Sequence, residues 1–240
     1  MGKIYVVGIG PGSKGHITPS AVEAIRRCSV IVGYKTYLPF IQSFTRGKKV
    51  LATGMKQEIE RCKTAIEHAA IGHNVCVVSG GDAGVYGMAG LIHELVEDDM
   101  EVEIVPGVTA ANAAAACLGA PLMHDYVVIS LSDLMTDWRL IKKRLVYAGQ
   151  GDFVVVLYNP KSMGRPTHIQ TAREILLNYK RKNTPVGIVR HATREKETIF
   201  ITNLMDMPIE EIDMSSVVII GNSNTYVKNG KIITPRGYQI

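Results

Sequence analysis

Short runs of β-branched residues alternate along this chain with segments whose apolar positions repeat at helical spacing, a pattern typical of α/β folds. In the first half the pattern predicts strands at residues 4–7, 30–32, 75–78 and 101–105, and helices that begin after Thr18 and at 58, 88 and 110. Because strands and helical segments alternate here, we expect a mostly parallel sheet.

In the second half the pattern predicts strands at residues 127–131, 153–158, 186–189, 198–202 and 217–220, with helices at 138–147 and 168–182. The last connections are short, so we expect this sheet to be mixed. Gly119 and Pro121 end an alanine-rich helix between the halves, which favours a boundary near residues 119–124. We therefore predict two α/β domains, residues 1–121 and residues 122–240.

Helical spacing also predicts which side chains face the core. In the first helix, which Thr18 caps with Pro19 in its first turn, one face carries Ala21, Ile25 and Cys28. In the helix at 58–71, the inward positions are expected to be Ile59, Cys62, Ile66 and Ala69.

The most informative motif is SGGDAGVYG at residues 79–87, in which four glycines surround Asp82 directly after a buried strand. Open α/β sheets bind their ligands beyond the carboxyl ends of the strands, and a backbone without side chains can lie against a ligand. An ordinary turn needs only one or two glycines. We therefore interpret this segment as a ligand-binding loop.

A second glycine-rich loop, GIGPGS at residues 8–13, follows the first strand. A dinucleotide fingerprint requires glycine where Ser13 stands, and Pro11 removes a backbone amide that would bind phosphate. The sequence also lacks the GK[ST] of a Walker loop at the required distance. The loop indicates a ligand without phosphates, although a purely structural turn explains this motif equally well.

Other candidate chemistry lies at further strand ends. Tyr34 and Tyr37 flank Lys35 in GYKTY and could stack on a planar ligand and bind a carboxylate, or could be a surface turn. In the second half, polar groups follow three predicted strands, in the segments SLSD (130–133), YNPKS (158–162) and RHATR (190–194). These ends could line a cleft. His191 is a candidate acid or base, and no spacing indicates a catalytic triad or a bound metal.

Composition adds three points. With 46% hydrophobic residues among 240, the chain can bury a sizeable core, and no apolar run approaches the roughly 20 residues of a membrane span, so we expect a cytoplasmic protein. The cysteines at positions 28, 62, 76 and 117 are scattered, which argues against a disulfide framework. The segment from Arg139 to Lys196 contains thirteen basic residues and three acidic ones. This excess of positive charge indicates either an ordinary solvated surface or a surface that attracts a polyanion.

Taken together, the segments GYKTY, SGGDAGVYGMAG, PGVTAANAAAACLGAPL, ISLSDLMTDW, VVVLYNPKS and GNSNT resemble the tetrapyrrole (corrin/porphyrin) methyltransferases over nearly the whole chain. Within that family they are most similar to the branch that methylates C17 of cobalt-factor III or precorrin-3B during ring contraction in cobalamin biosynthesis. The resemblance implies two α/β domains with S-adenosylmethionine in the cleft between them. It also implies a homodimer.

By motif, the resemblance assigns cofactor contacts to Pro11, Gly80, Gly81, Asp82, Gly84, Val85, Tyr86, Thr109, Ala110, Leu157, Tyr158, Asn159 and Ala192. A carboxylate-rich macrocycle would be bound by Tyr37, Lys161, Arg165, Arg190 and Arg194. Proton movement during ring contraction is assigned to Tyr34, Lys35, Ser132, Asp133 and His191, where His191 departs from the asparagine expected in this branch. Two alternatives stay open: methylation of another tetrapyrrole such as uroporphyrinogen III, or a nucleic-acid-binding module. The leading hypothesis has no nucleic-acid or membrane partner.

Overall fold

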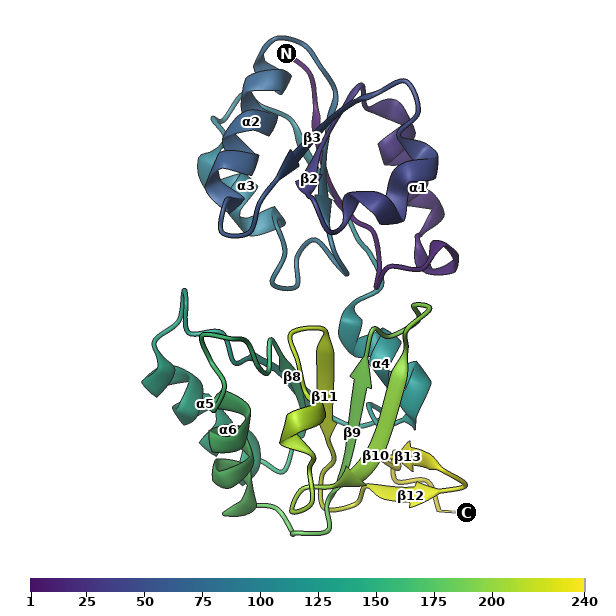
Figure 1. Cartoon of the computed structure of the whole chain (residues 1–240), viewed down its shortest axis with the longest axis vertical. Helices are drawn as coiled ribbons and strands as arrows, with labels where there is room; N and C mark the ends of the chain where they lie inside the picture. The colour runs from purple at the N-terminus through teal and green to yellow at the C-terminus, as the bar shows by residue number, and fades with distance from the viewer. Residues whose placement is uncertain (240) are drawn as a thin grey trace. The chain divides into compact units, whose positions relative to one another are not determined.

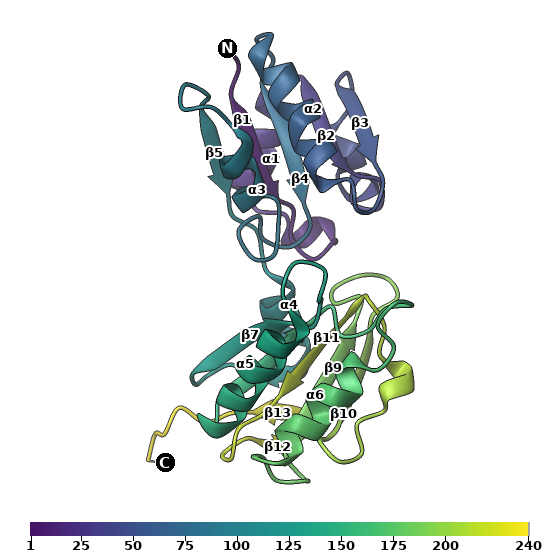
Figure 2. The same ribbon diagram turned by 90° about the vertical axis from the view of Figure 1, so that its left-hand side faces the viewer.

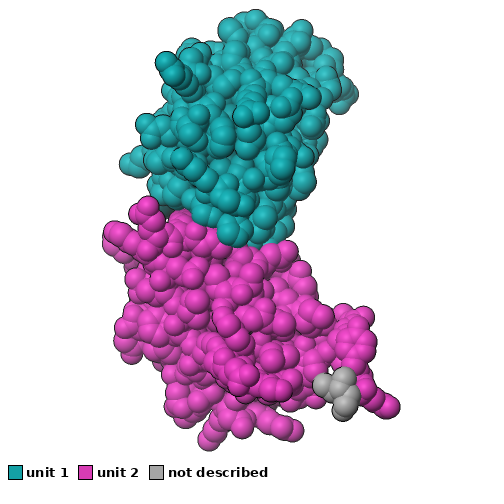
Figure 3. All heavy atoms as spheres, turned by 90° about the vertical axis from the view of Figure 1, so that its right-hand side faces the viewer, with its two compact units in different colours: residues 1–110 teal, residues 111–240 magenta. Residues whose placement is uncertain are grey.

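The structure, a computed structural model, describes residues 1–239 of the chain and divides into two compact units, Met1–Ala110 and Ala111–Ile240 (Figure 3). This division lies upstream of the boundary that the sequence suggests. The reason is that helix α4 (Ala110–Leu118) continues directly into strand β6 (Gly119–Ala120), which pairs with β13 (Lys231–Ile233) near the end of the chain. The alanine-rich helix therefore folds with the second unit.

Unit 1 contains one parallel five-stranded sheet in the order β3-β2-β4-β1-β5 (Figure 2). Its strands are β1 (Ile4–Gly8), β2 (Val30–Tyr34), β3 (Lys49–Thr53), β4 (Val75–Ser79) and β5 (Val102–Val105). The sequence predicts all of them except β3. That strand lies at the sheet edge with Val50 exposed, so it lacks the continuous apolar run of a buried strand. The parallel arrangement is confirmed.

Helices cover both faces of this sheet (Figure 1). Helix α1 (Pro19–Arg27) packs on one face, with α2 (Glu58–Ala70) and α3 (Ala89–Leu95) on the other. Thr18 caps α1 as predicted, because its hydroxyl accepts a hydrogen bond from the Ala21 amide at 3.1 Å. The inward face predicted for α2 is wrong at one position: Ile59 is 56% exposed, and Arg61 lies buried instead.

Unit 2 contains a mixed sheet in the order β10-β9-β11-β8-β7, as predicted, and a small sheet in the order β12-β13-β6. The strands not yet introduced are β7 (Tyr126–Ser130), β8 (Val154–Tyr158), β9 (Pro185–Arg190), β10 (Thr198–Asn203), β11 (Ser216–Ile220) and β12 (Tyr226–Lys228). Within the large sheet β7 and β8 pair in parallel, and the other pairs are antiparallel.

Helices α5 (Trp138–Gln150) and α6 (His168–Leu177) pack on one face of the large sheet and close its apolar core (Figure 1). Helix α6 ends five residues earlier than the predicted 182, at Leu177. The Asn178 side-chain Nδ2 donates back to the Glu174 carbonyl at 3.0 Å, and the Lys180 Nζ donates to the Phe153 carbonyl at 2.8 Å. Within residues 1–239 no helix is long and apolar enough to cross a bilayer.

Candidate methyl-donor and substrate loops

The glycine-rich loops of unit 1 meet where the parallel strands end. Gly10 and Gly81 exchange two backbone hydrogen bonds, with N···O distances of 3.0 and 2.8 Å. Both residues have positive φ, 73° and 67°, a conformation that glycine adopts without steric cost. The loops after β1 and β4, which the sequence singles out separately, therefore form one connected surface.

Asp82 ties this surface to the loop after β5. Its Oδ1 accepts the Gly84 amide at 2.8 Å, and its Oδ2 accepts the Gly107 amide at 2.9 Å. A carboxylate that accepts two backbone amides holds both segments in place. The structure thus assigns Asp82 an organising role in addition to the cofactor contact that the resemblance implies.

Close packing explains why glycine is required at two of these positions. A Cβ on Gly107 would lie 2.2 Å from the Gly81 carbonyl oxygen and 2.7 Å from the Gly8 carbonyl carbon. A Cβ on Gly80 would lie 2.7 Å from Cζ of Tyr37. Tyr37 of the GYKTY segment therefore lies directly against the SGGD loop, and the rings of Tyr34 and Tyr37 meet edge to face with centroids 5.3 Å apart.

In unit 2 the carboxyl ends of β7, β8 and β9 lie at the same end of the large sheet. The reason is that β8 and β9 are both antiparallel to β11, and β7 is parallel to β8. Ser130 joins two of the three predicted polar strand ends: its hydroxyl accepts the Asn159 side-chain amide at 2.9 Å and the Ser132 backbone amide at 3.2 Å. The Tyr158 hydroxyl accepts the Ala111 amide at 2.7 Å and so holds the first turn of α4. Leu157 is fully buried.

Asp133 has a histidine partner that the sequence analysis does not single out. The His168 Nε2 lies 3.2 Å from Asp133 Oδ2, and the Trp138 ring packs on His168 with centroids 4.0 Å apart. Arg165 Nε lies 3.9 Å from the other oxygen of Asp133. Sequence analysis misses His168 because only the tertiary fold brings the start of α6 to the loop after β7.

The predicted substrate-binding cations differ in how they are engaged. Lys161 donates to the Ile209 carbonyl at 3.0 Å, and Arg190 lies 3.5 Å from both the Glu211 and the Asp213 carboxylates. Arg165 donates from Nε to the Ser162 hydroxyl at 3.1 Å, whereas its buried Nη1 has no hydrogen-bond partner within residues 1–239.

Backbone strain concentrates in the same loops. Seven non-glycine residues in the described part of the chain have positive φ, and four of them lie at these two sheet edges: Tyr86 (53°), Asn159 (50°), His191 (49°) and Thr193 (65°). Such conformations cost energy and persist only where the surroundings impose them. This clustering independently marks the loops as candidate functional segments.

The strained segment 191–194 is held by Glu197, which sequence analysis does not single out. One carboxylate oxygen, Oε2, accepts the Thr193 amide at 2.6 Å and the Cys117 thiol at 3.1 Å. Burial and the bond to Glu197 raise the pKa of Cys117 to about 11, so the thiol stays protonated and able to donate. Glu197 thus connects the loop after β9 to helix α4.

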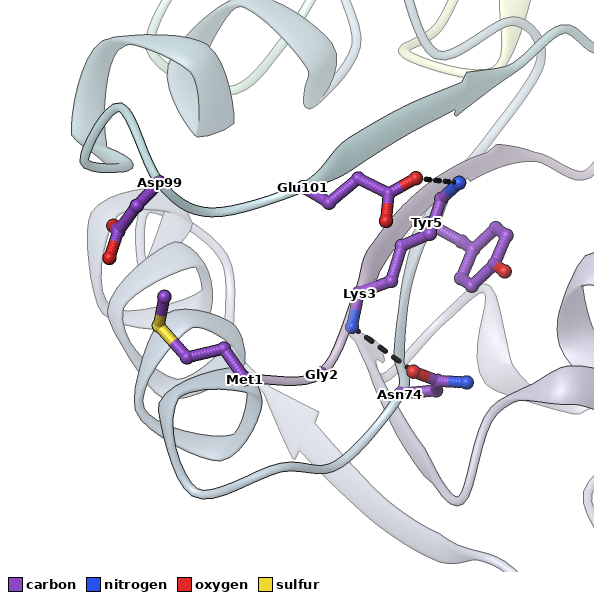
Figure 4. Close-up of a pocket in the computed structure, with 7 residues that line it drawn as sticks. All are labelled: Met1, Gly2, Lys3, Tyr5, Asn74, Asp99 and Glu101. Atoms are coloured by element: carbon purple, nitrogen blue, oxygen red, sulfur yellow. Dashed lines mark hydrogen bonds and ion pairs between the residues drawn. The ribbon is translucent and has the colours of Figure 1, made fainter.

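An open hollow of about 440 Å³ lies at the opposite edge of the unit 1 sheet, beside the start of β1 (Figure 4). Its lining consists of Met1, Gly2, Lys3, Tyr5, Asn74, Asp99 and Glu101. Lys3 there is already paired with Glu101 and with Glu103, at 2.9 Å from the latter. Within residues 1–239, no three His, Cys, Asp or Glu side chains come together in a way that could hold a metal ion.

Comparison with known proteins agrees with these features. Residues 3–208 match the family model of tetrapyrrole (corrin/porphyrin) methylases. The chain is 53% identical to a probable cobalt-factor III C(17)-methyltransferase of Salmonella typhimurium, covering 99% of this chain and 100% of that protein. It is 38% identical to a precorrin-3B C(17)-methyltransferase of Sinorhizobium sp., covering 99% and 97%. The crystal structure of the methyltransferase CobJ matches with a TM-score of 0.92 at 36% identity, over 98% of this chain and 100% of that one.

Proposed function

The chain belongs to the tetrapyrrole (corrin/porphyrin) methylases, and on this premise we propose that it methylates C17 of a corrin precursor, cobalt-factor III or precorrin-3B. It is an S-adenosylmethionine-dependent methyltransferase of cobalamin biosynthesis, and the methylation is coupled to ring contraction. The observation that carries the proposal is the joining of the loops after β1, β4 and β5 through Gly10, Gly81, Asp82 and Gly107.

The residues of these loops fit the methyl donor. The glycines leave backbone uncovered, and S-adenosylmethionine has no phosphate, which agrees with a loop interrupted by Pro11. From unit 1 we propose as cofactor contacts Pro11, Gly80, Gly81, Asp82, Gly84, Val85, Tyr86, Thr109 and Ala110. From unit 2 we propose Leu157, Tyr158, Asn159 and Ala192. Because Leu157 is fully buried, we expect only its backbone to reach a ligand.

When bound, S-adenosylmethionine supplies an electrophilic methyl group whose bond to sulfur breaks as the ring carbon forms its new bond. The protein must then orient the ring and exclude water, and it needs no strong nucleophile of its own. Tyr34, Lys35, Ser132, Asp133 and His191 remain our proposed groups for proton movement. The pairing of Asp133 with His168 adds His168 to this set, because a histidine beside a carboxylate is a suitable proton carrier.

For the acidic groups of the macrocycle we propose Tyr37, Lys161, Arg165, Arg190 and Arg194. Arg165 Nη1 and Arg190 Nε are both buried without a hydrogen-bond partner in the described chain, so each has a donor that a carboxylate could use. Lys161 and Arg190 would have to share their existing partners with the substrate.

The function is tested by incubating purified protein with S-adenosylmethionine and either cobalt-factor III or precorrin-3B. We expect one methyl group to be added, seen by mass spectrometry, together with the absorption spectrum of the ring-contracted product. Comparing the two substrates side by side decides whether the natural substrate contains cobalt. Absence of methyl transfer to both would refute the proposal, and transfer to uroporphyrinogen III instead would support the alternative tetrapyrrole.

Removal of the Glu197 carboxylate tests the loop after β9. We expect Glu197→Ala to weaken S-adenosylmethionine binding roughly tenfold, because the strained Thr193 amide loses its acceptor. Glu197→Gln keeps an acceptor oxygen and should bind nearly as wild type does. Calorimetric titration measures both, with Glu195→Ala as a neighbouring exposed control. Equal affinity in Glu197→Ala and Glu195→Ala would show that this loop does not bind the cofactor.

The proposal includes a cytoplasmic homodimer, as the resemblance implies. Sedimentation velocity at several protein concentrations tests the oligomeric state, and a monomer at all of them would contradict it.

A further inference from the structure

Arg61 is an unusual residue for the interior of unit 1, since its side chain lies on the inner face of α2 and is only 3% exposed. Nε donates to the Thr53 hydroxyl at 2.6 Å and Nη2 donates to the Gly54 carbonyl at 3.1 Å. Nη1 lies 3.4 Å from the Met88 sulfur, and the guanidinium carbon lies 5.9 Å from the centre of the Tyr34 ring. Arg61 thus contacts the ends of β2 and β3 and the residue that precedes α3.

All of these partners are uncharged. Within residues 1–239 no carboxylate lies within 4.0 Å of the Arg61 guanidinium, and this includes Glu58, one turn earlier on the same helix. Arginine is rarely buried without a counter-charge, because removing a cation from water is costly. A neutral amide such as that of glutamine could donate to the same hydroxyl and carbonyl without the cost of burying a charge. The positive charge is therefore the property of Arg61 that its packing does not explain.

The position of this charge indicates a ligand. Tyr34 and Thr53 are the last residues of β2 and β3, so Arg61 lies beneath the sheet edge at which parallel α/β sheets bind ligands. The exposed Lys35 follows Tyr34 directly at the same edge, and its amide donates to the Thr53 carbonyl at 3.1 Å. The edge therefore carries two positive charges, one of them poorly screened by water.

We propose that Arg61 is a specificity-determining residue whose buried, uncompensated charge attracts a carboxylate of the macrocycle to the Tyr34 edge of unit 1. Thr53 and Tyr34 hold Arg61 in place, and its charge acts at a distance without touching the substrate, so it is a positioning residue. The inference rests on the proposed function, because it takes the acidic tetrapyrrole as the anion. It adds a determinant within the unit that also carries the methyl-donor loops.

The test compares the neutral variants Arg61→Met and Arg61→Gln with the charge-retaining Arg61→Lys, and uses Lys63→Met as a control at an exposed position of the same helix. The probes are uroporphyrin and coproporphyrin, which carries fewer carboxylates, and binding is followed by porphyrin fluorescence at low and high salt. S-adenosylmethionine affinity is measured calorimetrically on every variant. Arg61→Gln keeps hydrogen-bond donors for Thr53 and Gly54, so it covers the case in which Arg61→Met does not fold.

We expect the neutral variants to bind uroporphyrin about tenfold more weakly at low salt, with a smaller loss for coproporphyrin and at high salt. Arg61→Lys should recover most of the affinity, and S-adenosylmethionine binding should change less than about twofold. If Arg61→Gln binds uroporphyrin as Lys63→Met does, or if Arg61→Lys is as weak as Arg61→Gln, the inference is wrong. Failure of the wild type to transfer a methyl group would instead refute the proposed function, whatever the porphyrin affinities.

Discussion

Replacement of Gly107 with alanine is expected to lower methyl transfer about a hundredfold or more and to destabilise unit 1 by about 1–3 kcal/mol. The added methyl would lie 2.2 Å from the Gly81 carbonyl oxygen and 2.7 Å from Gly8, and both neighbours are backbone atoms that cannot rotate away. The loop after β5 must therefore move off the SGGD loop. The measurements are steady-state kinetics for both substrates and a denaturant unfolding curve.

The matched control is Gly90→Ala. Apart from its chain neighbours and its own helix backbone, a Cβ at this helical glycine meets no atom within 4 Å, so alanine should leave activity unchanged and should stabilise α3 by roughly 1 kcal/mol. Wild-type activity in Gly107→Ala would mean that the packing of these loops has no part in the reaction.

Removal of the Asp82 carboxylate is expected to have the second-largest effect. Asp82→Ala leaves the Gly84 and Gly107 amides without their acceptors, which costs about 1–3 kcal/mol of unfolding free energy. We expect S-adenosylmethionine affinity to fall by about tenfold or more, because the loop loses its link to Gly107 and its negative charge. Calorimetric titration of the folded variant measures this loss.

Asp82→Asn separates the loss of the hydrogen bonds from the loss of the negative charge. Asparagine keeps one acceptor oxygen but turns an NH₂ group toward one of the two amides, so it should lie between alanine and wild type in stability. The control is Asp98→Ala, at an exposed acid in the turn before β5. A folded Asp82→Ala protein with wild-type cofactor affinity would remove Asp82 from the proposed site.

The strands that form the two cores could be predicted because each is a short apolar run. β4 and β8 are buried over most of their length, and this alone makes them recognisable. All three residues of β12 are exposed, and the strand is held by its pairing with β13. Its sequence therefore lacks the apolar run that predicts a strand. In α2 the helical periodicity is correct, but hydropathy predicts that Ile59 is buried and Arg61 exposed, and the structure shows the reverse. Hydropathy does not include the hydroxyl, carbonyl and ring partners that allow the guanidinium to be buried.

The sequence was sufficient to predict which loops form the candidate site, but not which side chains meet within it. Glycines at 80, 81 and 84 indicate a ligand at the end of β4, and the structure joins that loop to Gly10 and Gly107. Pairings between distant segments were not predictable. Asp133 meets His168 and Glu197 meets Thr193 and Cys117 only because β7, β9, α4 and α6 converge in the folded unit, and no spacing in the sequence encodes such contacts.

The left-handed residues at the sheet edges have a practical consequence for engineering. Glycine at Thr193 or Tyr86 would relieve the local conformational cost, so a library screened only for heat resistance should enrich such changes. The same changes would give the loops more conformational freedom, so they would less often adopt the conformation that binds a ligand. A stabilised biocatalyst from this scaffold should therefore be selected for turnover and heat resistance together, with these positions held constant.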